Sequence, residues 1–351
     1  MMKALQELRY YLQFAFGSHT GKLINHGERT GRTAIGRGEK MDYGKFVKSQ
    51  IADIKKTIGK EKAISALSGG VDSSVATLLA HKALGSNLKV IFIDTGQMRQ
   101  NEPQQVKKTF AELSIKVQVI DARKQFFAAL KGLTDPEEKR KAFRDTFYKT
   151  FGKAVKTSGA RFLVQGTIAP DIIETKKAVK TQHNVLGQIG IDSKRGYGFT
   201  AVEPLKTLFK PDVRQVGKIL GLPAVMHQRM PFPGPGLSCR VVGEVTPDRV
   251  EIVRRACKIV EEETKQFKPF QAFGVLLADR ATGLKRDGTR AFGNIVAIRC
   301  VDSKDAMTAK PTKVTWAAMV RMQERIVKEI PGVTKVLYDL TPKPPSTIEY
   351  I

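Results

Sequence analysis

The alternation of short apolar runs with helix-forming segments most constrains the fold of this chain. From Lys62 onward the pattern is strand, loop and helix, repeated. Strands are predicted at residues 63–67, 88–94, 116–121 and 161–165, and helices at residues 71–84, 103–113 and 135–157. Strands that alternate with helices in this way form a parallel sheet covered on both faces. The sequence therefore predicts an α/β domain whose binding site lies outside the carboxyl ends of the strands.

The pattern changes after the fourth strand. Residues 168–200 hold His, Asn, Lys and Gly but few large apolar side chains, and a connection of this length predicts a functional lid. After a helix expected at 211–220, the Pro- and Gly-rich segment 230–237 predicts a rigid crossover, because it cannot be regular structure. Helices are expected near 247–265 and 315–330, and strands near 272–278, 294–301 and 334–340. This mixed order predicts a second domain of the α+β class.

We expect the first domain to span residues 41–229 and the second to span residues 230–351. Residues 1–40 show helical apolar spacing only as far as Phe16, and the stretch after it is rich in Gly, Arg and Thr. A well-patterned helix face begins only after Met41, with Ile54 and Ile58 among its apolar positions. Residues 1–40 are therefore expected to be a flexible extension, unless Met41 is the real start of the protein.

The composition, with 41% hydrophobic and 27% charged residues, is that of an ordinary globular protein. No run approaches the ~20 apolar residues that span a membrane. The N-terminus also lacks the basic-then-apolar pattern of a secretion signal. Cys239, Cys257 and Cys300 are scattered and form no CxxC pair, which argues against a disulfide framework and a zinc site. We expect a reduced, cytoplasmic protein with no membrane partner.

The net charge of +26 is the unusual bulk feature. Such a charge favours anionic partners, which include nucleotides, RNA and acidic protein surfaces. The alternative is that Lys and Arg are spread over a solvated surface. No long basic cluster interleaved with aromatic residues is present, so a nucleic-acid partner is not expected, and the sequence does not decide between a polyanion surface and dispersed charge.

Residues 68–74, with the sequence SGGVDSS, carry the strongest chemical signal, and we name them the phosphate loop. They follow a predicted buried strand and open a predicted helix. Glycines let the backbone approach a phosphate closely, and N–H groups at a helix N-terminus donate hydrogen bonds to the anion. Asp72 among phosphates is understandable if Mg²⁺ lies between them. The loop lacks the GxxxxGK[ST] spacing, which disfavours cleavage between the β- and γ-phosphates. A structural turn is the alternative, but a turn does not require so many hydroxyl groups.

The phosphate loop resembles the pyrophosphate loop of the N-type ATP pyrophosphatases. That family includes GMP synthase, NAD synthetase, argininosuccinate and asparagine synthetases, and tRNA-modifying enzymes. The resemblance implies that ATP is cleaved between its α- and β-phosphates, which yields an adenylated intermediate and pyrophosphate. The loop by itself does not choose among these enzymes.

Five further segments resemble GMP synthases in particular. They are IDTG at 93–96, QGTIAPD at 165–171, KTQHNV at 180–185, PFPGPGL at 231–237 and KPPSTIE at 343–349. The resemblance covers residues 41–351 in order and does not extend to residues 1–40. It implies a carbon–nitrogen ligase of purine biosynthesis, in which XMP, ATP and ammonia give GMP, AMP and pyrophosphate.

Carried over residue by residue, the resemblance assigns four groups of functional residues. The ATP and pyrophosphate group is Ser68, Gly69, Gly70, Val71, Asp72, Ser73, Ser74, Asp94, Gly166 and Thr167. The XMP group is Arg99, Gln271, Asp287, Lys343 and Glu349. The catalytic group is Asp72, Glu174, Lys180 and His183, and the Mg²⁺ group is Asp72 and Asp171. A lysine in the lid would neutralise charge on the α-phosphate as the xanthine oxygen attacks, and lid closure would keep water from the adenylate.

The chain departs from the family pattern at several informative places. Gln182 stands where the lid motif usually has the first of two histidines, and the loop before Asp287 is altered. The Gly-x-Cys-x-Gly element that hydrolyses glutamine is missing. Ammonia is therefore expected from solution or from a separate glutamine amidotransferase subunit. The resemblance also implies a homodimer formed through the second domain.

Two other functions compete with XMP amination. A tRNA-modifying pyrophosphatase would fit the loop and the basic charge, but it predicts a CxxC pair or an added RNA-binding module, and the sequence has neither. An inactive binding scaffold would fit the altered lid, but the intact phosphate loop and the KPPSTIE segment argue against it.

Overall fold

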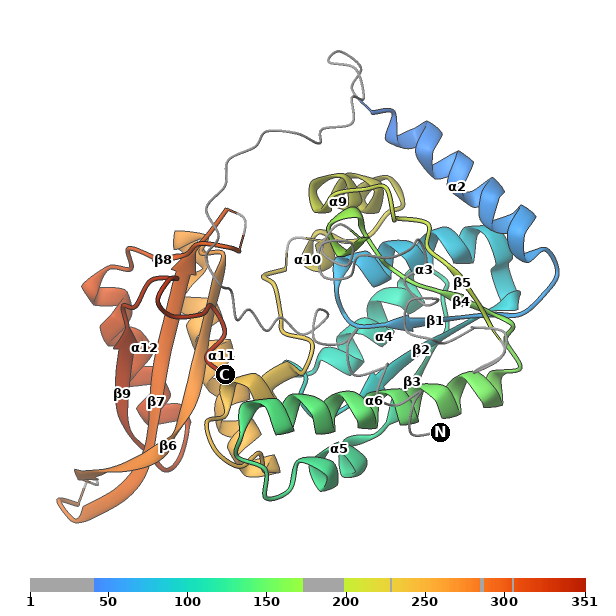
Figure 1. Cartoon of the computed structure of the whole chain (residues 1–351). Helices are drawn as coiled ribbons and strands as arrows, with labels where there is room; N and C mark the ends of the chain where they lie inside the picture. Colours follow the sequence, from blue (N-terminus) through green and yellow to red (C-terminus); the bar gives the residue numbers. More distant parts are fainter. Residues whose placement is uncertain (1–40, 173–198, 228, 285–286, 305) are drawn as a thin grey trace, which may run out of the picture. The chain divides into compact units, whose positions relative to one another are not determined.

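The computed structural model describes residues 41–172, 199–227, 229–284, 287–304 and 306–351 (Figure 1). The chain divides into two compact units. Of the residues described, the first consists of 41–65, Val71–Lys89, 159–172 and 199–227, and the second consists of Ala66–Gly70, Val90–Ser158, 229–284, 287–304 and 306–351. Among the described residues, no helix is both long and apolar enough to cross a membrane.

A parallel sheet of five strands, in the order β3-β2-β1-β4-β5, confirms the expected α/β class. The strands are β1 Ala63–Leu67, β2 Leu88–Asp94, β3 Val117–Asp121, β4 Phe162–Val164 and β5 Thr200–Val202. The β1–β4, β2–β3 and β4–β5 pairs are all parallel. The sequence did not predict β5, which lies at the end of the expected lid segment. A strand of three half-buried residues is too short to show a periodic pattern.

Seven helices in the described part of the chain accompany this sheet. They are α2 Tyr43–Ile58, α3 Val71–Leu84, α4 Glu102–Glu112, α5 Arg123–Leu130, α6 Pro136–Ser158, α9 Lys210–Ile219 and α10 Ala224–His227. Helix α2 is amphipathic as expected, with Ile54 and Ile58 buried, and the Asp42 side chain caps its N-terminus. Helix α5 was not predicted. It packs against α6 through Phe126 and Phe143, whose ring centroids are 4.7 Å apart.

The C-terminal part of the second unit is an α+β structure, as expected. Its elements are α11 Pro247–Thr264, β6 Gln271–Leu284, β7 Arg290–Asp302, β8 Lys310–Pro311, α12 Trp316–Glu329 and β9 Val333–Asp339. Strand β7 pairs antiparallel with β6 and β8, and parallel with β9. Buried Val253 and Val260 of α11 and Phe273 of β6 belong to its core. Strands β6 and β7 run further than predicted, because their hairpin continues into exposed residues that lack an apolar pattern.

The expected crossover is irregular as far as Pro235 and then enters a short 3-10 helix, Gly236–Arg240. Gly236 has a φ of 66°, and a Cβ there would lie 2.3 Å from the carbonyl oxygen of Gln97. Only glycine permits this approach. The crossover is therefore packed tightly on the segment that follows β2 within the second unit.

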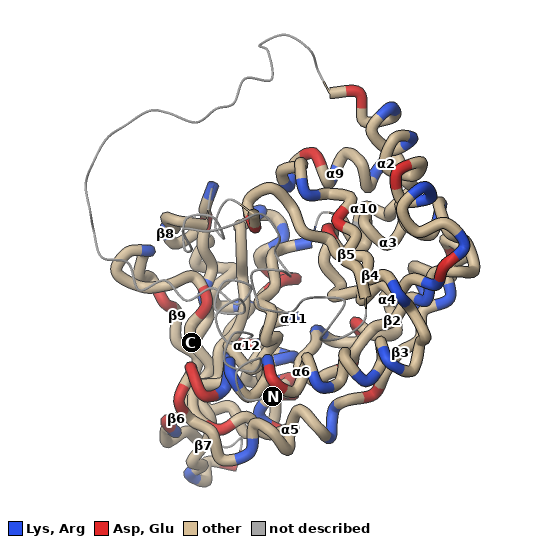
Figure 2. Tube along the Cα trace, turned by 45° about the vertical axis from the view of Figure 1, so that its right-hand side comes forward, with Lys and Arg blue, Asp and Glu red and all other residues tan. Residues whose placement is uncertain are grey.

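Charged side chains are dispersed over the described elements. Figure 2 shows Lys and Arg along the helices and strands, with Asp and Glu placed between them. This distribution favours the interpretation in which the net charge of +26 is spread over a solvated surface.

Candidate functional site

The phosphate loop joins β1 to α3, so it lies at the carboxyl end of a parallel strand and at a helix N-terminus. Backbone N–H groups and the helix dipole make such a position suitable for an anion. Gly69 has a φ of 76°, and a Cβ there would lie 2.6 Å from Oε1 of Glu102. The N–H of Gly70 donates to Oγ of Ser68 over 3.4 Å. The local geometry is that expected for a phosphate-binding loop.

Gly166, at the end of β4, lies against the loop as the sequence predicted. A Cβ on Gly166 would be 2.7 Å from the backbone carbon of Asp72 and equally close to the nitrogen of Ser73. This approach requires glycine, and it brings the end of β4 against the start of α3 within the first unit. The hydroxyl of Thr167 donates to Oε1 of Glu203 over 2.7 Å. Glu203 was not singled out from the sequence.

Asp72 is suited to hold a metal ion. Its Oδ1 is buried and has no hydrogen-bond partner among the described residues, while its Oδ2 lies 3.5 Å from Nζ of Lys210. A buried carboxylate oxygen without a protein partner is costly unless a ligand satisfies it, and oxygen is the ligand atom that Mg²⁺ prefers. No cluster of three His, Cys, Asp or Glu side chains that could hold a metal is found in the described ranges. Most of the remaining ligands would therefore be phosphate oxygens or water.

Two other predicted residues of the ATP and Mg²⁺ groups have local structural partners. Asp171 accepts the backbone N–H of Ile168 over 2.9 Å. Asp94, at the end of β2, accepts the N–H of Gly96 over 2.9 Å and lies 3.8 Å from Nε of Arg123. Their contacts with ATP or Mg²⁺ stay predictions.

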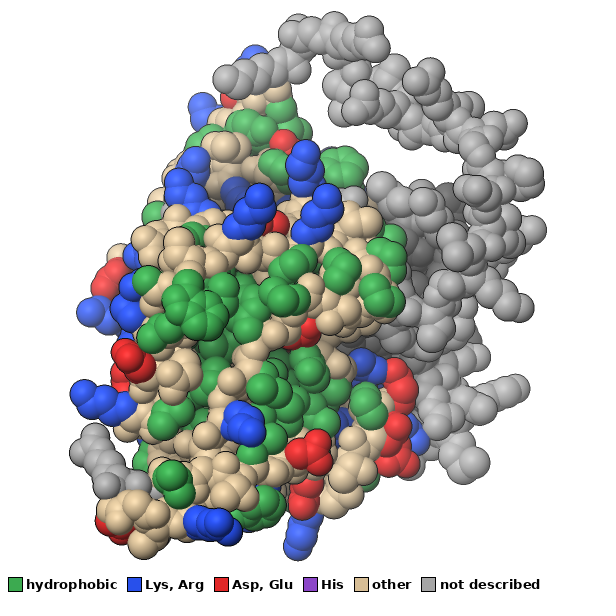
Figure 3. Space-filling model, turned by 90° about the vertical axis from the view of Figure 1, so that its left-hand side faces the viewer, with side chains coloured by type: hydrophobic (Ala, Val, Ile, Leu, Met, Phe, Trp, Pro, Cys, Tyr) green, Lys and Arg blue, Asp and Glu red, His purple; other side chains and the backbone are tan. Residues whose placement is uncertain are grey.

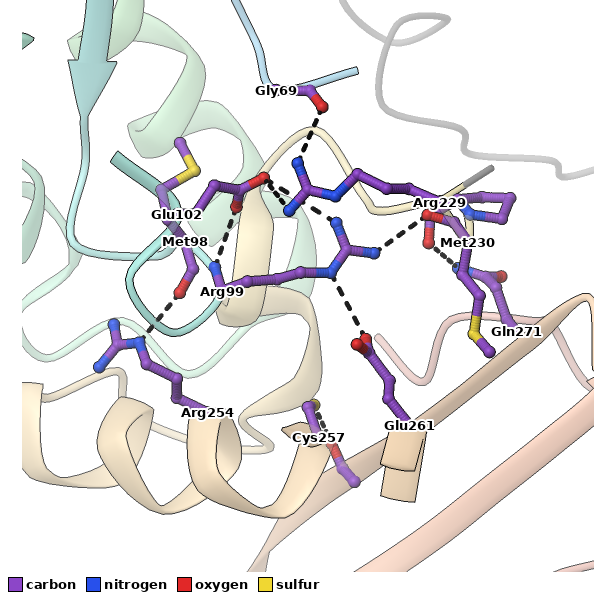
Figure 4. A network of polar contacts seen from close by, with 12 residues as sticks. Gly69, Met98, Arg99, Glu102, Arg229, Met230, Arg254, Cys257, Glu261 and Gln271 are labelled. Carbon is purple, nitrogen blue, oxygen red and sulfur yellow. Dashed lines mark hydrogen bonds and ion pairs between the residues drawn. The ribbon is translucent and has the colours of Figure 1, made fainter. Parts of the chain in front are cut away.

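Arg99 is largely buried in the second unit, and its guanidinium is shared among several groups (Figure 4). Its Nη2 donates to the carbonyl of Met230 over 3.0 Å, and its Nε lies 3.4 Å from Oε1 of Glu261. The guanidinium carbon also lies 4.2 Å from the ring centroid of Phe232. Burial lowers the pKa of Arg99, and the nearby Glu261 and Glu102 carboxylates oppose that shift.

Gln271 and Glu349 meet beside the same segment. Nε2 of Gln271 donates to Oε1 of Glu349 over 2.8 Å and to the carbonyl of Pro231 over 3.1 Å. Arg99, Gln271 and Glu349 come from three distant parts of the sequence. Arg99 and Gln271 contact residues 230–232, and Glu349 contacts Gln271. The structure thus brings together three of the five residues predicted to bind XMP.

Sequence reasoning missed Arg240, which organises this group. It is 1% exposed, and it donates to both carboxylate oxygens of Glu349, over 3.0 and 2.9 Å. Its guanidinium also faces the rings of Phe232 and Phe273, at 5.1 and 4.0 Å from their centroids. Although burial disfavours its charge, the Glu349 carboxylate raises the pKa of Arg240. No local pattern distinguishes Arg240 in the sequence.

Arg299 is a second buried arginine that was not predicted from the sequence, although the sequence contains a signal for it. Arg299 is fully buried in β7 and donates to the carbonyls of Thr347 and Ile348 over 2.6 and 2.9 Å. It interrupts the apolar run of β7, and a charge inside a buried strand must have polar partners. Arg240 and Arg299 together hold the C-terminal segment in place.

Lys343 and Asp287 are placed differently from the other predicted XMP residues. Nζ of Lys343 donates to the carbonyl of Ala306 over 2.9 Å. Asp287 lies in the turn between β6 and β7, where it accepts hydrogen bonds from the N–H and hydroxyl of Thr289. Strand β6 extends roughly 40 Å at the usual rise per residue, so within one chain Asp287 does not join Gln271, which lies at its other end.

Glu174, Lys180 and His183 all lie outside the described residues. Their catalytic roles stay predictions.

The five-stranded sheet and its phosphate loop define the class of α/β ATP pyrophosphatases. Family models described as NAD synthase and GMP synthase C terminal domain match residues 43–234 and 258–350. The B subunit of the glutamine-hydrolyzing GMP synthase of Archaeoglobus fulgidus is 50% identical over 311 residues, which is 88% of this chain and 100% of that protein. The equivalent protein of Pyrococcus horikoshii is 49% identical over 88% of this chain and 100% of its own length. The chain therefore belongs to the family of GMP synthase B subunits, ATP-dependent ligases of GMP biosynthesis.

Proposed function

We propose that this chain adenylates XMP at its C2 oxygen and then replaces that group with ammonia. ATP loses pyrophosphate when the xanthine oxygen attacks the α-phosphate, and ammonia then displaces AMP to give GMP. The observation that carries this proposal is the phosphate loop, which joins the carboxyl end of β1 to the N-terminus of α3. Ser68 to Ser74 would hold the pyrophosphate group.

The test is an assay with XMP, Mg·ATP and an ammonium salt. AMP release and the loss of XMP absorbance are followed together. We expect one AMP per XMP consumed. AMP release that does not depend on XMP would overturn the proposal.

We further propose that Asp72 holds Mg²⁺ together with the ATP phosphates. The ion would supply positive charge at the phosphates, and the orphaned carboxylate oxygen of Asp72 supports this role. Asp171 is a second candidate ligand. The lid residues Lys180, His183 and Glu174 are proposed to act on the reacting groups from the family resemblance alone.

XMP is proposed to bind beside residues 230–232. The convergence of Arg99, Gln271 and Glu349 supports this position. Arg99 offers a guanidinium that can pair with a phosphate, and Glu349 offers a carboxylate that accepts from N–H groups of a purine. Lys343 is a proposed contact on the C-terminal segment.

Ammonia is proposed to come from a separate glutamine amidotransferase subunit, because the relatives are named as the B subunits of glutamine-hydrolyzing enzymes. Cys239, Cys257 and Cys300 are all buried and free. Burial raises the pKa of Cys239 and of Cys300 to about 12, so neither thiol supplies a thiolate at neutral pH. The chain without a partner should use ammonium and not glutamine. Turnover with glutamine would contradict this.

We also propose a homodimer and a cytoplasmic location. Large exposed hydrophobic side chains of the second unit include Phe292, Trp316, Leu337 and Leu340. Figure 3 shows hydrophobic side chains gathered on one face of the molecule, and such patches commonly mark protein interfaces. Light scattering tests the dimer. Cell fractionation tests the location, which the three reduced cysteines support.

A further inference from the structure

Glu102 carries a buried carboxylate that has no role in the reaction proposed above. It is the first residue of α4 and is only 1% exposed. A carboxylate buried to this degree is strongly unfavourable unless cations and hydrogen bonds surround it. Its position beside the phosphate loop therefore requires an explanation.

Two arginines share the Glu102 carboxylate. Nη2 of Arg229 lies 2.9 Å from Oε1, and Nη1 of Arg99 lies 4.0 Å from the same oxygen. The other oxygen, Oε2, accepts the backbone N–H of Arg99 over 3.1 Å. The side chains of Arg99 and Arg229 are 14% and 17% exposed, so water screens these ion pairs little.

Arg229 connects this carboxylate to the phosphate loop. Its Nη1 donates to the carbonyl of Gly69 over 3.1 Å, while its Nη2 stays on Glu102 (Figure 4). Glu102 also touches the loop directly, because a Cβ on Gly69 would lie 2.6 Å from its Oε1. Gly69, in its left-handed conformation, thus lies against both the Glu102 carboxylate and the Arg229 guanidinium.

Arg99 connects the same carboxylate to the proposed XMP pocket. Its guanidinium donates to the carbonyl of Met230 and lies over Phe232. Phe232 in turn lies under Arg240, the partner of Glu349. A continuous set of polar and cation–π contacts therefore runs from the phosphate loop to the C-terminal segment.

We propose that Glu102 and Arg229 are positioning residues that couple occupancy of the XMP pocket to the geometry of the phosphate loop. The inference rests on the proposed function. An anion that binds Arg99 draws that guanidinium away from Oε1 of Glu102, so that Oε1 pairs with the guanidinium of Arg229 and no longer with that of Arg99. Arg229 then holds the carbonyl of Gly69 more firmly, which favours the ATP-binding conformation of the loop. By thermodynamic reciprocity, ATP strengthens XMP binding by the same factor.

The test measures the affinity for a non-hydrolysable ATP analogue by calorimetry, with Mg²⁺ present, in the absence and in the presence of saturating XMP. In the unaltered full chain we expect XMP to tighten analogue binding about fivefold or more, the lower end of typical coupling. Glu102→Gln keeps the size of the side chain and an acceptor for the N–H of Arg99, but it removes the charge that both arginines share. We expect the XMP effect to fall to less than about twofold.

Arg254→Gln is the matched control. Arg254 has an 18% exposed side chain and donates to the carbonyls of Gly96 and Met98, in the turn that precedes Arg99. No contact of Arg254 with Glu102 or Gly69 is found among the described residues. If Glu102 only supports the local structure, both variants should bind the ATP analogue more weakly. If Glu102 couples the two sites, only Glu102→Gln should lose the effect of XMP on analogue affinity.

Arg229→Gln gives an independent measurement if Glu102→Gln fails to fold. It should lose the XMP effect to the same extent, and the double variant should lose no more than either single one. An XMP effect of normal size in a folded Glu102→Gln or Arg229→Gln chain would overturn the inference. Failure of the proposed function is distinguishable, because the unaltered chain would then release no XMP-dependent AMP.

Discussion

Asp72 combines a buried carboxylate oxygen that has no partner in the described structure with a second oxygen near Lys210. We predict that Asp72→Asn lowers kcat/KM for ATP by at least about 100-fold, the upper range seen when groups that only support a metal ligand are removed. The fold should persist, because Lys210 is half exposed and an exposed ion pair contributes little.

Binding of Mn²⁺ in the presence of an ATP analogue provides a readout that does not depend on turnover. Asp72→Asn should weaken Mn²⁺ binding strongly. Asp171→Asn should weaken Mn²⁺ binding less, because Asp171 already accepts the N–H of Ile168. Wild-type metal affinity in Asp72→Asn would rule out the proposed ligand.

Lys139 gives the stability of the second unit a pH dependence. It is 3% exposed, its Nζ donates to the carbonyls of Val241 and Gly243, and burial lowers its pKa from 10.5 to about 8. Between these two values the unfolded chain binds more protons than the folded chain. The free energy of unfolding therefore rises with pH across that window.

Urea unfolding of the wild type and of Lys139→Met, at about pH 7.5 and about pH 9.5, tests this effect. The wild type should gain stability relative to the variant at the higher pH. Groups common to both chains cancel in the comparison. Equal pH slopes for the two chains would show that Lys139 does not titrate in this range.

At the scale of elements, the approach of β4 to the start of α3 depends on Gly166. A Cβ there would lie 2.7 Å from backbone atoms of Asp72 and Ser73, which cannot move aside as a side-chain tip can. Gly166→Ala should therefore destabilise the fold by about 1–3 kcal/mol and raise KM for ATP. Chemical denaturation and steady-state kinetics measure the two effects.

Gly217→Ala is the matched substitution in the same unit. Its Cβ would meet Cγ2 of Val75 at 3.1 Å, so the obstacle is a side chain of α3 and not the backbone of the phosphate loop. Its KM for ATP should not change. If Gly166→Ala also keeps a normal KM, the close approach of β4 does not shape the ATP site.

Elements with strong local patterns were predicted closely. Helix α3 and strands β1 and β2 have the bounds expected from the sequence, because their apolar runs end at Gly85, Ser68 and Asp94 respectively. Helix α5 and strand β5 were missed. Both are short, and the tertiary contacts that stabilise them, such as Phe126 on Phe143, are not visible in a local window.

At the scale of the whole molecule, the exposed apolar residues of the second unit predict self-association. Leu337 of β9 is 44% exposed, and a charge introduced there would have to be desolvated at an interface between two copies. Leu337→Glu should convert dimers to monomers, as measured by light scattering. The secondary structure should be unchanged, because glutamate in an exposed strand position is tolerated.

Ile219→Glu is the control, since Ile219 is an exposed apolar residue of the first unit, at the end of α9. It should leave the dimer intact. A monomeric wild-type chain, or a dimer that survives Leu337→Glu, would contradict the prediction.

The resemblance to GMP synthases implied the class of reaction, and the sequence by itself determined the parallel sheet and the phosphate loop. These depend on apolar periodicity, on glycines and on hydroxyls at a helix N-terminus, all of which lie close together in the chain. Only the tertiary structure decided which partners the buried charged side chains contact. Arg240 reaches Glu349 across 109 positions, and Arg229 reaches Gly69 across 160. A buried charge is stabilised by partners that folding brings to it, and no local pattern specifies where in the sequence those partners lie.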